Sequence, residues 1–191
     1  MLTFDAATHT YRWRGVIVPS VTQILGQLTD LSMVPPDVLE RKRQIGTWVH
    51  AAIELDLKND LDYDSIGEDW RGYFDGWLKF KRESGFAVVD AEAKVYSEKY
   101  RYAGTLDLLG DLPKVGRALI DTKCTATMYP SVGPQTAAYA EAHGATKAKR
   151  YALQLKPTGT YELHACPDKG DFGVFLAAKT LYDWRKKHGN H

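Results

Sequence analysis

The sequence predicts an α+β fold in which one mixed β-sheet is flanked by helices and follows a hairpin and a helical segment. Apolar residues recur at helical spacing from Trp70 to near Gly85, and the pattern changes to that of strands from Phe86, with two further helices predicted after it. The chain has 191 residues, of which 44% are hydrophobic, so it can bury a core without a metal or disulfide staple. We therefore expect one domain over 1–191, with a hairpin and helical part at about 1–85 and a sheet core at about 86–191.

The N-terminal part is expected to contain one hairpin and three helices. Residues alternate around Gly15 as in a hairpin, and Pro19-Ser20 precedes a short apolar run. Asp37, with Glu40 three residues later, fits a helix start of the capping-box kind. The predicted elements are a hairpin over 9–18, a short helix over 21–25, a helix from Pro35-Pro36-Asp37 through about Leu57, a polar loop over 60–68, and an amphipathic helix from Trp70 to near Gly85.

The C-terminal part is expected to contain the sheet. Strands are predicted at about 86–97, 100–110, 116–124, 148–156 and 159–165, and helices at about 131–143 and 170–187. This order of elements predicts a mixed sheet. The aromatic residues of the last helix fit packing on that sheet better than a cofactor site.

The formal net charge of +1 gives no bulk attraction for nucleic acid. Basic residues nevertheless cluster at 41–43, 79–82, 147–150 and 185–187, whereas 54–69 is acidic. Each cluster alone is typical of a solvated face. Together the clusters are compatible with a groove that follows a phosphate backbone.

Cys124 and Cys166 are too few for a disulfide framework or a four-cysteine cluster, and they fit two free thiols in a reducing cytoplasm. The N-terminus lacks the layout of a signal peptide, and no apolar run approaches the roughly 18 residues that cross a bilayer. We therefore expect a cytoplasmic protein without a membrane partner.

Three charged residues lie inside two predicted strands. Asp121 and Lys123 are two residues apart and share one face of their strand, and a short turn would bring Asp107 of the preceding strand beside Asp121. Burying such groups without partners costs several kcal/mol per ion, roughly, even after relaxation. Two aspartates and a backbone carbonyl suit Mg²⁺ or Mn²⁺, and the lysine can orient or activate a water. The alternative is an ion pair exposed at a sheet edge.

Two helical pairs add polar groups to this set. Gly46 precedes His50 by one turn, so the backbone there is expected to approach another element closely, and Glu54 extends the same face. Gln135 and Tyr139 stand at i and i+4 on the helix after the Asp-x-Lys strand. Taken singly, each pair is most often a packed helix face.

The order of these groups resembles the PD-(D/E)XK nucleases, most closely the RecB-like exonuclease branch. The resemblance extends over about residues 16–165, and Val18–Leu25 also resembles small phage nucleases of this branch. It implies a restriction-endonuclease-like core of order αβββαβ. The groups that carry it are Gly46 with His50, Glu92, Gly104-Thr-Leu-Asp107, Asp121-Thr-Lys123, and Gln135 with Tyr139.

The resemblance also implies a role for each residue. These roles are metal ligands at His50, Asp107, Asp121 and the Thr122 carbonyl; positioning of the attacking water and charge stabilisation by Lys123; DNA contact by Gln135 and Tyr139; an acid on the first core strand at Glu92; and an outside candidate for a second metal at Glu54. The implied cofactor is Mg²⁺, for which Mn²⁺ can substitute. No iron–sulfur cluster is expected, because the cluster-containing members use four cysteines.

The implied activity is metal-dependent exonuclease cleavage of linear DNA in phage recombination, replication or repair. The implied partners are DNA and a single-strand annealing protein, and the implied location is the host cytoplasm if the gene is phage-encoded. The motif departs from the family pattern in lacking a proline before Asp107 and in having Asp at position 121 where Glu is also used.

Three alternatives to an exonuclease fit parts of the same pattern. A structure-specific or non-specific endonuclease would have the same fold, and so would an inactive DNA-binding or scaffold protein, although the intact Asp107, Asp121 and Lys123 argue against inactivity. A zinc peptidase is a poor fit, since His50-Ala-Ala-Ile-Glu54 lacks a second histidine at the required spacing.

Overall fold

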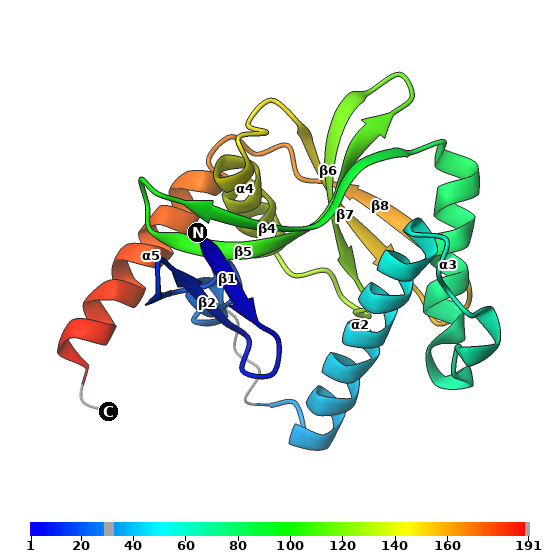
Figure 1. Ribbon diagram of the computed structural model, residues 1–191, viewed down its shortest axis with the longest axis horizontal. Coiled ribbons are helices and arrows are strands. Elements are labelled where there is room, and N and C mark those ends of the chain that lie inside the picture. Colours follow the sequence, from blue (N-terminus) through cyan, green and yellow to red (C-terminus); the bar gives the residue numbers. More distant parts are fainter. Residues whose placement is uncertain (29–32, 190–191) are drawn as a thin grey trace.

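The computed structural model describes residues 1–28 and 33–189 and contains two β-sheets with helices around them (Figure 1). The elements are β1 (Leu2–Asp5), β2 (Thr10–Trp13), β3 (Val16–Val18), α1 (Val21–Gly26), α2 (Pro36–Leu57), η1 (Tyr63–Ser65), α3 (Glu68–Ser84), β4 (Ala87–Ser97), β5 (Tyr102–Leu112), β6 (Gly116–Lys123), α4 (Val132–His143), β7 (Lys149–Leu155), β8 (Tyr161–Ala165) and α5 (Asp171–His188).

The larger sheet has the strand order β4-β5-β6-β7-β8. Neighbouring strands are antiparallel except β6 and β7, which are parallel. A parallel pair needs a crossover connection, and α4 provides it between these two strands. The predicted mixed sheet flanked by helices is therefore confirmed.

Helices cover both faces of this sheet (Figure 1). On one face, α2 and α3 bury Val49, Phe74 and Trp77 against Ile120 and Leu153. On the other face, α1, α4 and α5 pack on the sheet through a second cluster, which includes Ile24, Leu106, Leu119, Ala138 and Phe175. Each face of the sheet thus has its own apolar layer.

The smaller sheet is antiparallel, in the order β1-β2-β3, and lies beside β4 and β5. The ring of Trp13 stacks on that of Tyr96 with 4.4 Å between centroids, and the hydroxyls of Tyr11 and Thr105 are 2.6 Å apart. The predicted hairpin corresponds to β2 and β3. Strand β1 is not predicted by the sequence, because residues 6–9 before β2 contain no glycine or proline to mark a turn, as Gly15 does between β2 and β3.

The predicted capping box at the start of α2 is wrong. Pro35 is the N-cap and makes no side-chain capping bond, while Glu40 pairs with Arg43 instead, at 2.6 Å. A side-chain cap is less necessary here, because the fixed φ of proline suits the first turn of a helix. The described part of the chain has its capping box at α1, where Ser20 and Gln23 bond each other's backbone N–H groups at 3.0 Å.

The predicted polar loop is interrupted by one short helical turn, η1. Within 1–28 and 33–189, no helix combines the length and apolar character that crossing a membrane requires.

Candidate metal centre

Asp107 and Asp121 meet where β5 stops pairing with β6. The register runs from Leu112 opposite Gly116 to Leu108 opposite Ile120, so Asp107 and Asp121 are the next residues beyond the last pair. Instead of a backbone ladder bond, the Oδ2 atom of Asp107 accepts a hydrogen bond from the Thr122 N–H at 2.6 Å. Strand β6 meanwhile continues beside β7 as far as Lys123, so both carboxylates lie on a fixed backbone.

His50 reaches this point from α2, where the buried Val49 and Ile53 anchor the helix on the sheet. Its Nδ1 atom lies 3.2 Å from Glu92 Oε1 and 3.7 Å from Asp107 Oδ1. His50, Glu92 and Asp107 each offer a ligand atom within 4.8 Å of the others. Three elements that are distant in sequence, α2, β4 and β5, therefore contribute one compact group of residues of the types that bind metal ions.

Glu92 joins this group through an unusual backbone. The pairing of β4 with β5 shifts register between Val88 and Asp90, and Glu92 has φ of +51° inside the strand. A non-glycine residue held in this left-handed region costs on the order of 1–3 kcal/mol, and such strain concentrates at functional sites. The sequence predicts an uninterrupted strand here, and the resemblance names Glu92 only as an acid on that strand, so the bulge and the place of Glu92 among the ligand candidates are findings of the structure.

Asp121 and Lys123 form a close pair beside the group. Asp121 is fully buried, and its Oδ2 atom lies 2.7 Å from Lys123 Nζ. Both of its carboxylate oxygens are buried without a hydrogen-bond donor among the residues that the structure describes, and Oδ1 also lacks the ion-pair contact that Oδ2 has. A buried carboxylate oxygen without a donor costs free energy, so Oδ1 favours an additional positive partner.

The charges at the site are strongly coupled. Burial lowers the pKa of His50, but the negative charges of Asp107 and Glu92 more than offset this effect and raise the pKa to about 9. The imidazole is therefore protonated at neutral pH when no metal is bound, and it partly compensates the two carboxylates.

The two buried aspartates resist ionisation. Burial raises the pKa of Asp121 to about 6, because the opposing effect of Lys123 is only partial and Asp107 adds repulsion. Burial likewise raises the pKa of Asp107, with His50 offsetting part of the change. Burial lowers the pKa of Lys123, but Asp121 and Asp107 outweigh it, so the net shift is upward and the ammonium keeps its proton.

These residues fit a hard divalent cation. Carboxylate oxygens suit Mg²⁺ and Mn²⁺, and an imidazole nitrogen suits Mn²⁺ better than Mg²⁺. The crowded carboxylates of Glu92 and Asp107 are the feature that a cation would relieve, whereas Asp121, although predicted as a ligand, is not part of the group within 4.8 Å. The Thr122 carbonyl lies 3.3 Å from His50 Nε2, so it can fix the ring and leave Nδ1 facing the carboxylates.

Helix α4 presents Gln135 and Tyr139 to the same region. Gln135 Nε2 donates to the Tyr139 hydroxyl at 3.2 Å, and Tyr139 is 4% exposed. Burial raises the pKa of Tyr139 well above its usual value, and the negative charges of Asp121 and Asp107 add to the shift. The phenol is therefore a neutral donor that lies within electrostatic reach of the two aspartates.

The two glycines of the predicted motifs differ. A Cβ at Gly104 would lie 2.5 Å from Cε1 of Tyr139, so the absence of a side chain there lets the phenol ring pack against β5. A Cβ at Gly46 would meet nothing within 4 Å. The expectation that Gly46 permits close backbone approach is therefore wrong, because α2 has open space on that side.

Glu54 is less directly involved than the other acids. Its Oε1 atom accepts from Lys58 at 2.6 Å, although its side chain lines a small pocket together with His50, Glu92 and Asp107.

Tyr11 is a neighbour that the sequence motifs do not indicate. Burial raises its pKa, as do the charges of Glu92 and Asp107. Its only sequence signal is its place in an alternating hairpin.

The structure thus gathers most of the predicted site residues around the end of β6. Those that approach one another are His50, Glu92, Asp107, Asp121, Thr122 and Lys123, with Gln135 and Tyr139 on the adjoining helix. No known protein-family model matches the chain, and no curated protein does either.

Proposed function

We propose that the protein is a Mg²⁺-dependent deoxyribonuclease that hydrolyses phosphodiester bonds at the ends of linear DNA. The observation that supports this most is the meeting of His50, Glu92 and Asp107, with ligand atoms within 4.8 Å of one another, next to the Asp121–Lys123 pair. Phosphoryl transfer requires residues that can bind a metal ion and a positively charged side chain at the same buried place, and Lys123 is that side chain.

The arrangement of elements supports a restriction-endonuclease-like core of the PD-(D/E)XK type. The order α3-β4-β5-β6-α4-β7 corresponds to the αβββαβ order that the resemblance implies. Asp107 lies on the second of these strands, Asp121 and Lys123 on the third, and Gln135 and Tyr139 on the helix that follows.

A bound Mg²⁺ supplies Lewis-acid chemistry, which lowers the pKa of a coordinated water and stabilises charge on a phosphate oxygen. His50, Glu92 and Asp107 would hold the ion, and the free Oδ1 of Asp121 is available beside them. The Thr122 carbonyl orients His50, and the Thr122 N–H fixes Asp107.

Lys123 contributes a fixed charge and not a base. Because its pKa is raised, it stays protonated and can donate to an attacking water or to a phosphate oxygen as negative charge grows. Gln135 and the neutral phenol of Tyr139 can donate to phosphate oxygens of the bound strand. Contacts of this kind fix the position of the strand without reading its bases, so we expect little sequence preference.

The test compares linear duplex DNA with a covalently closed circle of the same sequence, in Mg²⁺ and in EDTA. Both substrates offer the same phosphates, so a difference in rate reports access to an end. We expect digestion of the linear duplex and sparing of the circle, with EDTA stopping the reaction. Equal cleavage of the circle would favour an endonuclease, and binding without cleavage of either substrate would favour a scaffold protein.

A further inference from the structure

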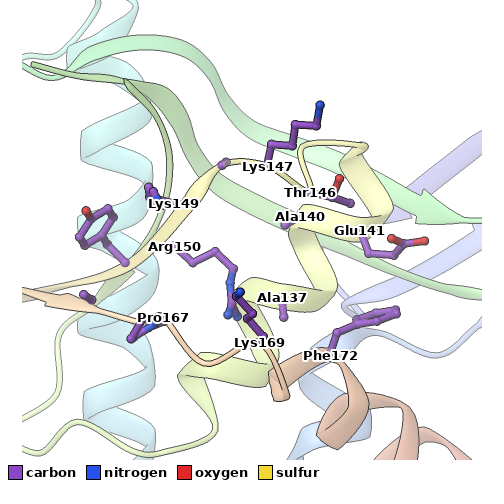
Figure 2. Close-up of a pocket in the computed structure, with 14 residues that line it drawn as sticks. Ala137, Ala140, Glu141, Thr146, Lys147, Lys149, Arg150, Pro167, Lys169 and Phe172 are labelled. Carbon is purple, nitrogen blue, oxygen red and sulfur yellow. The ribbon is translucent and has the colours of Figure 1, made fainter. Parts of the chain in front are cut away.

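A hollow of about 520 Å³ is lined by Ala137, Ala140 and Glu141 of α4, and we call it the α4–β7 hollow (Figure 2). Its walls come from α4, the turn between α4 and β7, the start of β7, and the segment between β8 and α5. The lining residues used below are Ala137, Ala140, Glu141, Lys147, Lys149, Arg150, Lys169 and Phe172.

Arg150 shapes this hollow and is not free to bind a ligand. One guanidinium nitrogen donates to the Gly133 carbonyl and to Asp171 Oδ2, both at 2.9 Å, and the other donates to the Asp168 carbonyl at 2.5 Å. These bonds tie β7 to α4 and to the first turn of α5. Asp171 neutralises the arginine, so the pair adds no net charge to the hollow.

Three further cations remain on its rim. Lys147, Lys149 and Lys169 have no salt bridge and no side-chain hydrogen bond within the described 1–28 and 33–189, and the acid among the lining residues is Glu141. Three ammonium groups around one concavity raise the local potential and attract a polyanion. The opposite wall, formed by Ala137, Ala140 and Phe172, is apolar and can pack against a sugar.

The register of β7 gives the offset between the hollow and the candidate metal centre along the sheet. On β7, Lys149 stands opposite Ala118 and Ala152 stands opposite Asp121, so Lys149 is three residues from the level of Asp121. At about 3.3 Å per residue this offset is about 10 Å along the strand.

Spacing of charge in DNA makes this separation suitable. A duplex carries one phosphate charge per about 1.7 Å of its axis, so a molecule with its scissile phosphate at the metal centre presents several more phosphates 10–20 Å away, roughly. We infer that the α4–β7 hollow binds backbone phosphates of the DNA that flank the cleaved bond. This inference rests on the proposed function.

The test measures the salt dependence of DNA binding in EDTA, where no cleavage occurs. One variant carries Lys147→Gln, Lys149→Gln and Lys169→Gln, and the control carries Arg12→Gln, Arg14→Gln and Lys114→Gln, which are exposed on the small sheet and on the β5–β6 turn. Each set removes three charges and changes the net charge from +1 to −2, so overall charge is matched.

We expect the slope of log K against log salt to become shallower in the hollow variant by about 0.9 for each phosphate that the hollow no longer neutralises, and to change little in the control. Equal slopes in the two variants, with wild-type binding and cleavage intact, would overturn the inference and leave a solvated basic face. Absence of both binding and cleavage in wild type would instead reject the proposed function. Lys169→Glu alone provides a second, less drastic variant, which should weaken binding in the same direction.

Discussion

His50 combines two roles that depend on whether a metal is bound. With its pKa raised to about 9 by Asp107 and Glu92, it is a cation that compensates carboxylates in the metal-free protein. A metal ligand must be a neutral imidazole, so binding at Nδ1 would release this proton while Nε2 keeps its contact with Thr122.

His50→Ala should therefore raise the Mg²⁺ concentration that gives half-maximal activity, by about tenfold or more when one ligand is removed. Mn²⁺, which accepts nitrogen ligands more readily, should restore part of the activity. The measurement is a metal titration of DNA cleavage for wild type and variant. An unchanged Mg²⁺ titration would show that His50 is a structural residue of the α2 interface.

The same histidine predicts a pH dependence of stability without metal. Because the folded-state pKa of about 9 lies above the ordinary histidine value of 6.5, the stabilisation that protonated His50 gives is complete below about pH 6.5 and is lost as the pH rises through 9. Melting temperatures in EDTA should thus favour wild type over His50→Gln at pH 6, and this advantage should shrink by pH 9.5. A difference between the two proteins that does not vary with pH would contradict the charge assignment.

At the scale of single elements, β5 and α4 depend on one small residue. A side chain at Gly104 would collide with the buried ring of Tyr139, and overpacking of this kind costs about 1–3 kcal/mol. We expect Gly104→Ala to lower the melting temperature and to displace Tyr139. Gly46→Ala is the matched control, since open space and a helical backbone should make it neutral or stabilising by up to about 1 kcal/mol. Similar melting temperatures for both variants would contradict the packing described.

Strand and helix positions can be predicted from the sequence where an apolar segment is long enough to be recognised. The helix at 131–143 and the strands around Asp107 and Asp121 are buried over most of their length and show no clear apolar period, so the length and residue types of these runs predict them. The shared face of Asp121 and Lys123 follows from the two-residue period of a strand. The bulge of β4 and the left-handed Glu92 could not be predicted, because tertiary contacts and not local preference impose them. Strand β1 is missed because no glycine or proline separates it from β2, and the cap predicted at the start of α2 is wrong.

At the scale of the whole molecule, the candidate site draws one group from each layer. Helix α2 supplies His50, the sheet supplies the carboxylates and Lys123, and α4 supplies Gln135 and Tyr139. No single segment of sequence contains this geometry, so the residue types could be predicted from motifs while Glu92 as a ligand candidate required the fold. Binding of Mg²⁺ to the folded state alone should raise the melting temperature in proportion to the logarithm of its concentration once the site is saturated.

The shifted pKa values of the two aspartates also predict how the stability of the metal-free protein changes with pH. The pKa of Asp121, about 6, lies above the ordinary aspartate value of 3.8, so this group favours folding most below about pH 3.8 and the benefit is lost as the pH rises through 6. Asp107 is shifted in the same direction. At pH 8 both ionised carboxylates are therefore unfavourable in the metal-free protein, whereas protonated Lys123 is favourable.

The most direct measurement is cleavage of linear duplex DNA in Mg²⁺ at pH 8 by Asp107→Asn, Asp121→Asn and Lys123→Ala, paired with their melting temperatures in EDTA. We expect all three to lose cleavage. The two asparagine variants should melt at or above the wild-type temperature, because a buried negative charge is gone, and Lys123→Ala should melt below it, because Asp121 loses its partner. Retained cleavage in all three folded variants would contradict the claim that these residues form the active site of a metal-dependent nuclease.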